Sequence, residues 1–188
     1  MKSGGTEWQT AQLVSELCTR FEILIWTFQE CEINSDLFLR FSSLPNVKIL
    51  FGKSRSVWRV IRFGPDVMIS YAIGYYVPEI LIRLICRPRF ITERRNLYHW
   101  MSRKPSVMSL HTLRNYLTDV VICNSRAVAD EVRIHEPEVI NRVRVIHNGV
   151  NQSEPGVMTS QRKKIIAVGN IKVGKGYDRV IPLFLEMQ

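Results

Sequence analysis

The sequence predicts an α/β fold in which a parallel sheet is flanked by helices. Short runs of β-branched residues alternate along the chain with longer segments whose apolar residues recur at helical spacing. The short runs are nearly continuous in apolar residues, which is typical of strands covered on both faces. With 188 residues, 46% of them hydrophobic, the chain is long enough to bury such a core.

The expected strands share this β-branched or apolar character. They are residues 22–28, 47–51, 66–71, 89–92, 119–124, 143–147 and 164–168. The expected helices carry apolar residues along one face. They are residues 6–21, 76–86, 105–117 and 125–135. We expect Thr6 and Gln9 to form a capping box at the first helix, and Ser125 to cap the last one.

The composition changes after residue 147, where polar residues and the turn pair Asn148-Gly149 are typical of a linker. We expect a first domain at residues 1–150, a linker at 151–161 and the start of a second domain at 162–188. A glycine turn such as Gly4-Gly5 normally follows the first strand of an open α/β sheet. We therefore expect the first domain to lack its first strand. The second domain should be incomplete, because about 25 residues cannot form an α/β domain.

The net charge of +9 is concentrated in basic clusters at residues 53–62 and 83–104. Such clusters attract the phosphates of nucleotides, nucleic acids or anionic lipids, and a solvated basic face is the structural alternative. No motif of a nucleic-acid-binding module occurs, so we expect no nucleic-acid partner. No cysteine or histidine pair has zinc-ligand spacing, so no metal is expected. The scattered cysteines and the short apolar runs are typical of a cytoplasmic protein.

Candidate ligand-binding residues stand where a strand ends or a helix begins. They are Gly4 and Gly5, then Asn124 and Ser125, and finally Gly169, Asn170, Lys175 and Gly176. Backbone amides at a helix N-terminus, with a lysine beside them, suit a diphosphate. A plain turn or helix cap is the structural alternative for each. Arg94 and Arg95 directly follow the apolar residues 90–92, and salt-bridged surface arginines are the alternative there.

Taken together and in this order, the motifs resemble those of family 4 glycosyltransferases of the GT-B fold. The resemblance rests on the Gly-Gly loop and on the stretches VICNSRAVADEV, VRVIHNGVN and IIAVGNIKVGKGYDRVI. It implies two Rossmann-like domains that face a cleft, with the acceptor on the first domain and the nucleotide sugar on the second. It further implies transfer with retention from a nucleotide-diphosphate sugar to a lipid-linked or polysaccharide acceptor, without a cofactor. An anionic membrane surface, on the inner face of the cell membrane, is a further expected partner.

On this resemblance, Lys175 and Gly176 would bind diphosphate, and Gly4 and Gly5 would close over the donor. Arg94 and Arg95 resemble a subgroup motif and are expected to be catalytic and to face the cleft. The family's two C-terminal glutamates would lie beyond Gln188, so we expect no transfer by this chain alone. The alternative function is a non-catalytic Rossmann-like module that binds a nucleotide or a partner.

Overall fold

The computed structural model describes residues 5–27, 35–52, 56–71, 76–96, 105–149 and 182. The chain divides into two compact units, Met1–Val150 and Asn151–Gln188. All strands described below belong to the first unit. The linker expected at 151–161 and the strand expected at 164–168 lie outside the described residues.

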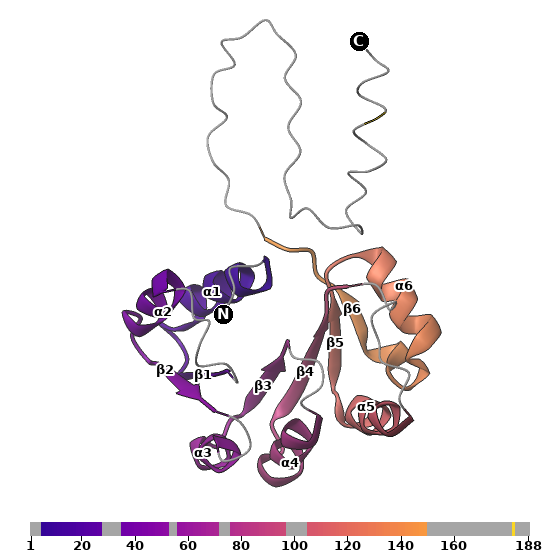
Figure 1. Ribbon diagram of the computed structural model, residues 1–188, viewed down its shortest axis with the longest axis horizontal. Helices are drawn as coiled ribbons and strands as arrows, with labels where there is room; N and C mark the ends of the chain where they lie inside the picture. Colours follow the sequence, from indigo (N-terminus) through magenta and orange to yellow (C-terminus); the bar gives the residue numbers. More distant parts are fainter. Residues whose placement is uncertain are drawn as a thin grey trace, which may run out of the picture. The chain divides into compact units, whose positions relative to one another are not determined.

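The strands form two parallel sheets (Figure 1). The first sheet joins β1 (Ile23–Thr27) to β2 (Val47–Phe51), with Ile23 opposite Val47. The second has the order β3-β4-β5-β6. Its strands are β3 (Val67–Ser70), β4 (Arg89–Arg94), β5 (Val120–Cys123) and β6 (Val143–Val145). Every pairing is parallel, so the predicted fold class is confirmed.

Each pair of consecutive strands is connected through a helix, as parallel pairing requires. The helices are α1 (Gly5–Leu17), α2 (Ser35–Ser42), α3 (Val57–Phe63), α4 (Tyr76–Cys86), α5 (Pro105–Leu117) and α6 (Arg126–His135), followed by the 3-10 helix η3 (Pro137–Arg142). The short helices α2 and α3 are absent from the sequence-based prediction. Helix α1 begins at Gly5, so Thr6 lies inside its first turn and the expected capping box is wrong.

The strands of the first sheet are packed on both faces. Ala11 and Val14 of α1 pack with Phe41 of α2 against one face of β1 and β2. On the opposite face, Val57 and Val60 of α3 form a core cluster that includes apolar residues of β1, β2, β3 and α4. Helices α3, α4 and α5 lie in a row beneath the strands in Figure 1. This row therefore covers part of both sheets.

A third apolar cluster lies at the far end of the second sheet. Val128, Ala129 and Val132 of α6 pack against β5 and β6, together with Val139 of η3. Ser125 accepts a hydrogen bond at its Oγ from the Val128 backbone N–H, at 3.2 Å, so the expected N-cap is confirmed. This cap fixes where the chain leaves β5 and enters α6, beside the ends of the neighbouring strands.

Candidate functional site

Polar side chains gather where the parallel strands of the second sheet end. Open α/β sheets bind ligands at the carboxyl ends of their strands, because the loops that follow the strands meet there. Here those loops contribute a phenol, a carboxylate, a guanidinium, an amide and an imidazole. We call these residues the edge cluster: Tyr71 after β3, Glu93 and Arg95 around the end of β4, Asn124 after β5, and His147 after β6.

Arg95 is held in place by two neighbours within this cluster. Its Nε donates to Glu93 Oε2 at 2.6 Å, and its guanidinium carbon lies 5.2 Å from the centre of the Tyr71 ring. The Arg95 side chain is partly exposed, as expected for a residue at the strand's end. Because Arg95 carries several N–H donors in a planar fork, the pair with Glu93 leaves donors that a phosphate or hydroxyl could use.

Tyr71 is a protonated phenol at neutral pH. Burial raises the pKa of Tyr71, and the negative charge of Glu93 raises it further, while a hydrogen bond with Thr10 and the charge of Arg95 partly oppose both. A neutral phenol can both donate and accept a hydrogen bond. Tyr71 therefore offers the edge cluster a hydroxyl that stays uncharged across the physiological range.

Asn124 connects the ends of three strands. The side-chain Nδ2 of Asn124 donates to the backbone carbonyl of Arg95 at 3.3 Å. The backbone carbonyl oxygen of Asn124 lies 3.1 Å from His147 Nδ1. The Asn124 Oδ1 atom is buried and has no hydrogen-bond partner among the described residues. Because a buried acceptor without a partner costs free energy, a donor brought to this oxygen by a small local rearrangement would be stabilised.

Helix α1 reaches the same edge from the first sheet. Gln9 donates from Nε2 to the Gly149 carbonyl at 2.6 Å, although the two residues lie far apart in the sequence. Gly5, one turn earlier, is exposed, and a Cβ atom built on it meets no atom within 4 Å. Of the predicted ligand-binding residues, the structure thus brings Gly5, Asn124 and Ser125 to one edge. Gly4, Gly169, Asn170, Lys175 and Gly176 lie outside the described residues.

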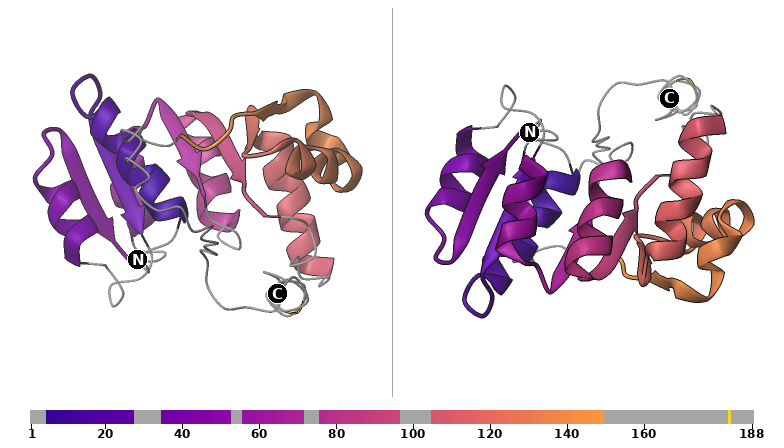
Figure 2. Two further views of the ribbon diagram at one scale, coloured as in Figure 1. Left: turned by 90° about the horizontal axis from the view of Figure 1, so that it is seen from above. Right: turned by 90° about the horizontal axis from the view of Figure 1, so that it is seen from below.

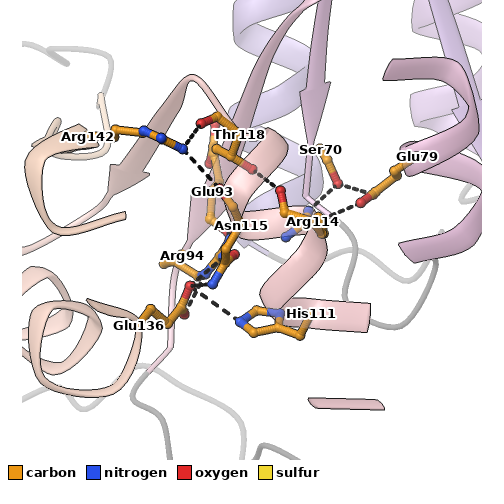
Figure 3. Close-up of polar contacts among 10 residues, drawn as sticks. All are labelled: Ser70, Glu79, Glu93, Arg94, His111, Arg114, Asn115, Thr118, Glu136 and Arg142. Atoms are coloured by element: carbon orange, nitrogen blue, oxygen red, sulfur yellow. Dashed lines mark hydrogen bonds and ion pairs between the residues drawn. The ribbon is translucent and has the colours of Figure 1, made fainter. Parts of the chain in front are cut away.

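Arg94 lies at the end of β4 as expected, but the expectation that its side chain faces the cleft is wrong. The residue is only 5% exposed and forms a bidentate ion pair with Glu136, at 3.0 Å from Nε and 2.8 Å from Nη2. Asn115 of α5 accepts from the same Nη2 and donates to Glu136, and His111 Nε2 lies 3.3 Å from that carboxylate (Figure 3). Arg94 therefore links the end of β4 to Glu136 and to Asn115 of α5 in the protein interior.

Glu136 remains ionised in this surrounding. Burial by itself would raise its pKa, but hydrogen bonds from His111 and Arg94, together with the charge of Arg94, hold the pKa at about 2. The residue is 1% exposed, so the ion pair is almost fully removed from water. A buried pair of this kind is strongly destabilised when one partner is removed, because the other charge is left unpaired.

A second buried ion pair lies beneath the end of β3. Arg114 of α5 donates to Glu79 of α4 and, at 2.9 Å, to the Ser70 hydroxyl, which in turn donates to Glu79 (Figure 3). The Arg114 guanidinium also lies 5.5 Å from the centre of the Phe90 ring. Burial lowers the pKa of Arg114, while the charge of Glu79 opposes that effect. The ends of β3 and β4 are thus both fixed by charges that are almost fully buried.

Most residues of this buried network are not among those predicted from the sequence. His111, Arg114 and Asn115 follow a spacing of three and four residues, which places them on one face of a helix. Polar residues at that spacing within a predicted helix, next to a sheet, were the available signal. Their partners Glu79 and Glu136 come from other elements, so the spacing alone does not identify them.

Two properties of the described residues bear on metal ions and on membranes. Within the described ranges, no group of three or more histidine, cysteine, aspartate or glutamate residues could hold a metal ion. Among the helices of those same ranges, none is both long enough and apolar enough to cross a bilayer.

The chain is similar to known proteins over most of its length. A family model described as Glycosyltransferase Family 4 matches residues 3–154. HepE from Anabaena, solved in complex with UDP, superposes with a TM-score of 0.63 at 17% identity, over 80% of this chain and 43% of HepE. The HepE complex with UDP-glucose gives a TM-score of 0.58 at 18% identity, over 80% and 42%. The chain thus spans less than half of HepE. No curated protein matches it.

Proposed function

The chain belongs to glycosyltransferase family 4, and from this premise we propose that it is the acceptor-side part of a retaining, nucleotide-sugar-dependent glycosyltransferase. The observation that carries the proposal is the edge cluster, which lies where parallel strands end and ligands bind. In such a reaction the departing diphosphate gains negative charge while the sugar becomes cationic. Positioned donors that stabilise this charge are the main source of catalysis that the chain can supply.

Arg95 is the residue that we assign to that charge. Its guanidinium is oriented by Glu93 and Tyr71 and remains partly exposed, so its remaining N–H groups can reach a phosphate oxygen. Arg94, whose donors are engaged in the protein interior, acts as a positioning residue that fixes the backbone just before Arg95. The Asn124 amide and the Tyr71 hydroxyl then provide uncharged partners for sugar hydroxyls.

The glycines and the lysine complete the donor side of the proposal. Gly5 leaves open space at the start of α1, so a donor can approach the backbone amides there. Gly4 precedes Gly5 in the sequence and would close over the donor together with it. Gly169, Asn170, Lys175 and Gly176 would bind the diphosphate on the donor side. Since HepE was solved with UDP and UDP-glucose, uridine nucleotides are the first donors to test, followed by guanosine nucleotides.

The acceptor that we propose is lipid-linked or a polysaccharide, met at the inner face of the cell membrane. The basic clusters at residues 53–62 and 83–104 support this proposal, because anionic headgroups attract arginine and lysine. We expect no glycosyl transfer by the chain alone, since transfer needs donor and acceptor held together in near-attack geometry. Its affinity for a nucleotide sugar should be on the order of millimolar, or about 4 kcal/mol.

Backbone amide NMR of the full chain, titrated with UDP-glucose, tests the proposal. We expect shifts at Arg95, Asn124 and Gly5 that report weak binding, and none at the exposed end of α6 near Ile134. Shifts confined to other surfaces would reject the site. Product from a labelled donor, or a micromolar Kd by titration calorimetry, would contradict the expected inactivity while leaving the site assignment intact.

The alternative is a non-catalytic module of the same fold that binds a nucleotide or a partner protein. It requires only the fold and the edge cluster, and no second domain. The two functions differ in what the edge cluster recognises. A module for nucleotides alone should give the same shifts with UDP as with UDP-glucose, whereas a transferase site should add shifts at Asn124 that require the sugar.

A further inference from the structure

The outer surface of the helix row α3–α4–α5 is unusually apolar for a surface. Along α4, Val77, Leu81, Leu84 and Ile85 follow the spacing of one helical face, and each is between 43% and 57% exposed. Trp58 of α3 is exposed on one side of this stripe, and Leu113 and Tyr116 of α5 are exposed on the other. Figure 2, right, looks onto the three helices from below. We call this surface the α3–α5 face.

The charge of the α3–α5 face is predominantly positive. Arg59 and Arg62 of α3 are exposed, as are Arg87 and Arg89 beyond the end of α4. Helices α3 and α5 contain no acidic residue, and the one acid of α4, Glu79, is buried against Arg114. Arg83 is paired with Asp119. The exposed acid closest in sequence to the end of α3 is Asp66, which directly precedes β3. Among the described residues, the apolar side chains are thus bordered by four exposed arginines and by one exposed acid, Asp66, whose carbonyl accepts a hydrogen bond from the Arg89 backbone N–H.

We propose that the α3–α5 face binds the surface of an anionic lipid bilayer. Leucine, isoleucine and valine side chains on one helix face can enter the boundary between headgroups and acyl chains, while arginines at the border contact lipid phosphates. Trp58 and Tyr116, at the two sides of the face, are the residue types that favour this boundary. A second copy is a poor occupant, because a two-fold contact would bring the same arginines together.

The direction of α4 gives this binding a consequence for the site. In a parallel sheet, a helix that follows a strand begins at the carboxyl edge, so Val77 lies near the edge cluster and Ile85 lies toward the opposite edge. With the stripe against a bilayer, the edge cluster would open beside the membrane surface, within reach of a lipid-anchored acceptor. This inference deepens the membrane partner of the proposed function, but lipid binding itself requires no transfer activity.

Vesicle flotation of the full chain, without any donor, tests the inference. We expect binding to vesicles of phosphatidylcholine mixed with phosphatidylglycerol, weak binding to phosphatidylcholine alone, and a decrease with added salt. The double variant Arg59→Gln/Arg62→Gln should lower the partition coefficient about tenfold or more, since each arginine contributes near the surface. The double variant Leu84→Ser/Ile85→Ser should lower the partition coefficient by a similar factor. It should leave the preference for anionic over neutral vesicles intact.

Matched controls lie on α6, away from the α3–α5 face. Ile134→Ser removes an apolar side chain that is 70% exposed, more than Leu84 or Ile85, and Arg126→Gln removes an exposed arginine. Because both lie away from the α3–α5 face, neither should change the partition coefficient more than about twofold. Equal loss in these controls, or equal binding to neutral and anionic vesicles, would overturn the inference. It would also be overturned by a concentration-dependent dimer that Leu84→Ser/Ile85→Ser abolishes, because the occupant would then be a second copy. If the protein transfers sugar but does not bind vesicles, the membrane inference is refuted while the proposed function stands.

Discussion

Replacing Glu136 by glutamine tests whether the buried network anchors β4. Glu136→Gln keeps the size of the side chain and removes its negative charge. Arg94 then stays 5% exposed but loses the carboxylate with which it forms the bidentate pair, and His111 and Asn115 lose the same carboxylate. Breaking a buried ion pair by removing one partner costs about 3–5 kcal/mol. Because glutamine can still accept one hydrogen bond from Arg94, we expect the free energy of unfolding to fall by an amount near the lower limit, about 3 kcal/mol.

The acid dependence of stability gives an independent magnitude. The pKa of Glu136 falls from 4.5 to about 2 on folding, which corresponds to about 3 kcal/mol. Because the folded pKa is the lower one, this stability is fully present above about pH 4.5. It is lost as the pH falls toward 2, and about 2 kcal/mol of it should be gone by pH 3. The glutamine variant has no such proton to bind.

Urea unfolding followed by circular dichroism, at pH 7 and again at pH 3, measures both effects. Wild type should exceed Glu136→Gln by about 3 kcal/mol at pH 7 and by about 1 kcal/mol at pH 3. Asp130→Asn, which breaks the exposed pair with Arg133, is the control and should cost less than about 0.5 kcal/mol. A Glu136→Gln variant within about 1 kcal/mol of wild type at pH 7, or with an unchanged pH dependence, would refute the buried ion pair.

If Glu136→Gln does not fold, a double variant keeps the question open to measurement. Arg94→Met together with Glu136→Gln removes the unpaired charge as well as its partner. Apolar replacements of buried ion pairs are often neutral or stabilising, so the double variant should recover most of the lost free energy of unfolding. A double variant that is no more stable than the single one would show that the charge of Arg94 is not the source of the loss.

Four further outcomes are expected. Gly5→Ala should leave stability unchanged or raise it by up to about 1 kcal/mol, because a Cβ meets no atom there, but should weaken UDP-glucose binding in an NMR titration if Gly5 lies under the donor. Arg95→Ala should weaken the same binding about tenfold, or about 1.4 kcal/mol, and unchanged binding would reject its role. Among the described strands, β1 and β3 pair on one side only, so their amides should exchange with deuterium at least about tenfold faster than those of β5. Burial raises the pKa of the Cys123 thiol to about 11, so mass spectrometry should find Cys86 alkylated well before Cys123 at pH 8.

Local patterns predicted several elements to the residue. The bounds of β2, α4 and α5 agree with those expected from apolar spacing, and α6 follows directly after its predicted cap, Ser125. Helices α2 and α3 were not expected, because each is only seven or eight residues long. Isolated helices of that length are unstable in water, so their helicity depends on packing against the strands. Part of that packing comes from Val57 and Val60, which contact residues of both sheets.

The sequence by itself determined the order of the described strands, their parallel arrangement and the edge at which polar residues gather. These follow from patterns within a few residues of each other. Only the tertiary structure decided what Arg94 and Arg95 do, although they are adjacent in the chain. Successive residues of a strand point to opposite sides. One side held Glu136, which lies 42 residues further along, and the other held Glu93 and Tyr71. The buried guanidinium and the partly exposed one differ because Glu136 and Tyr71, both distant in sequence, set the surroundings of Arg94 and Arg95 respectively.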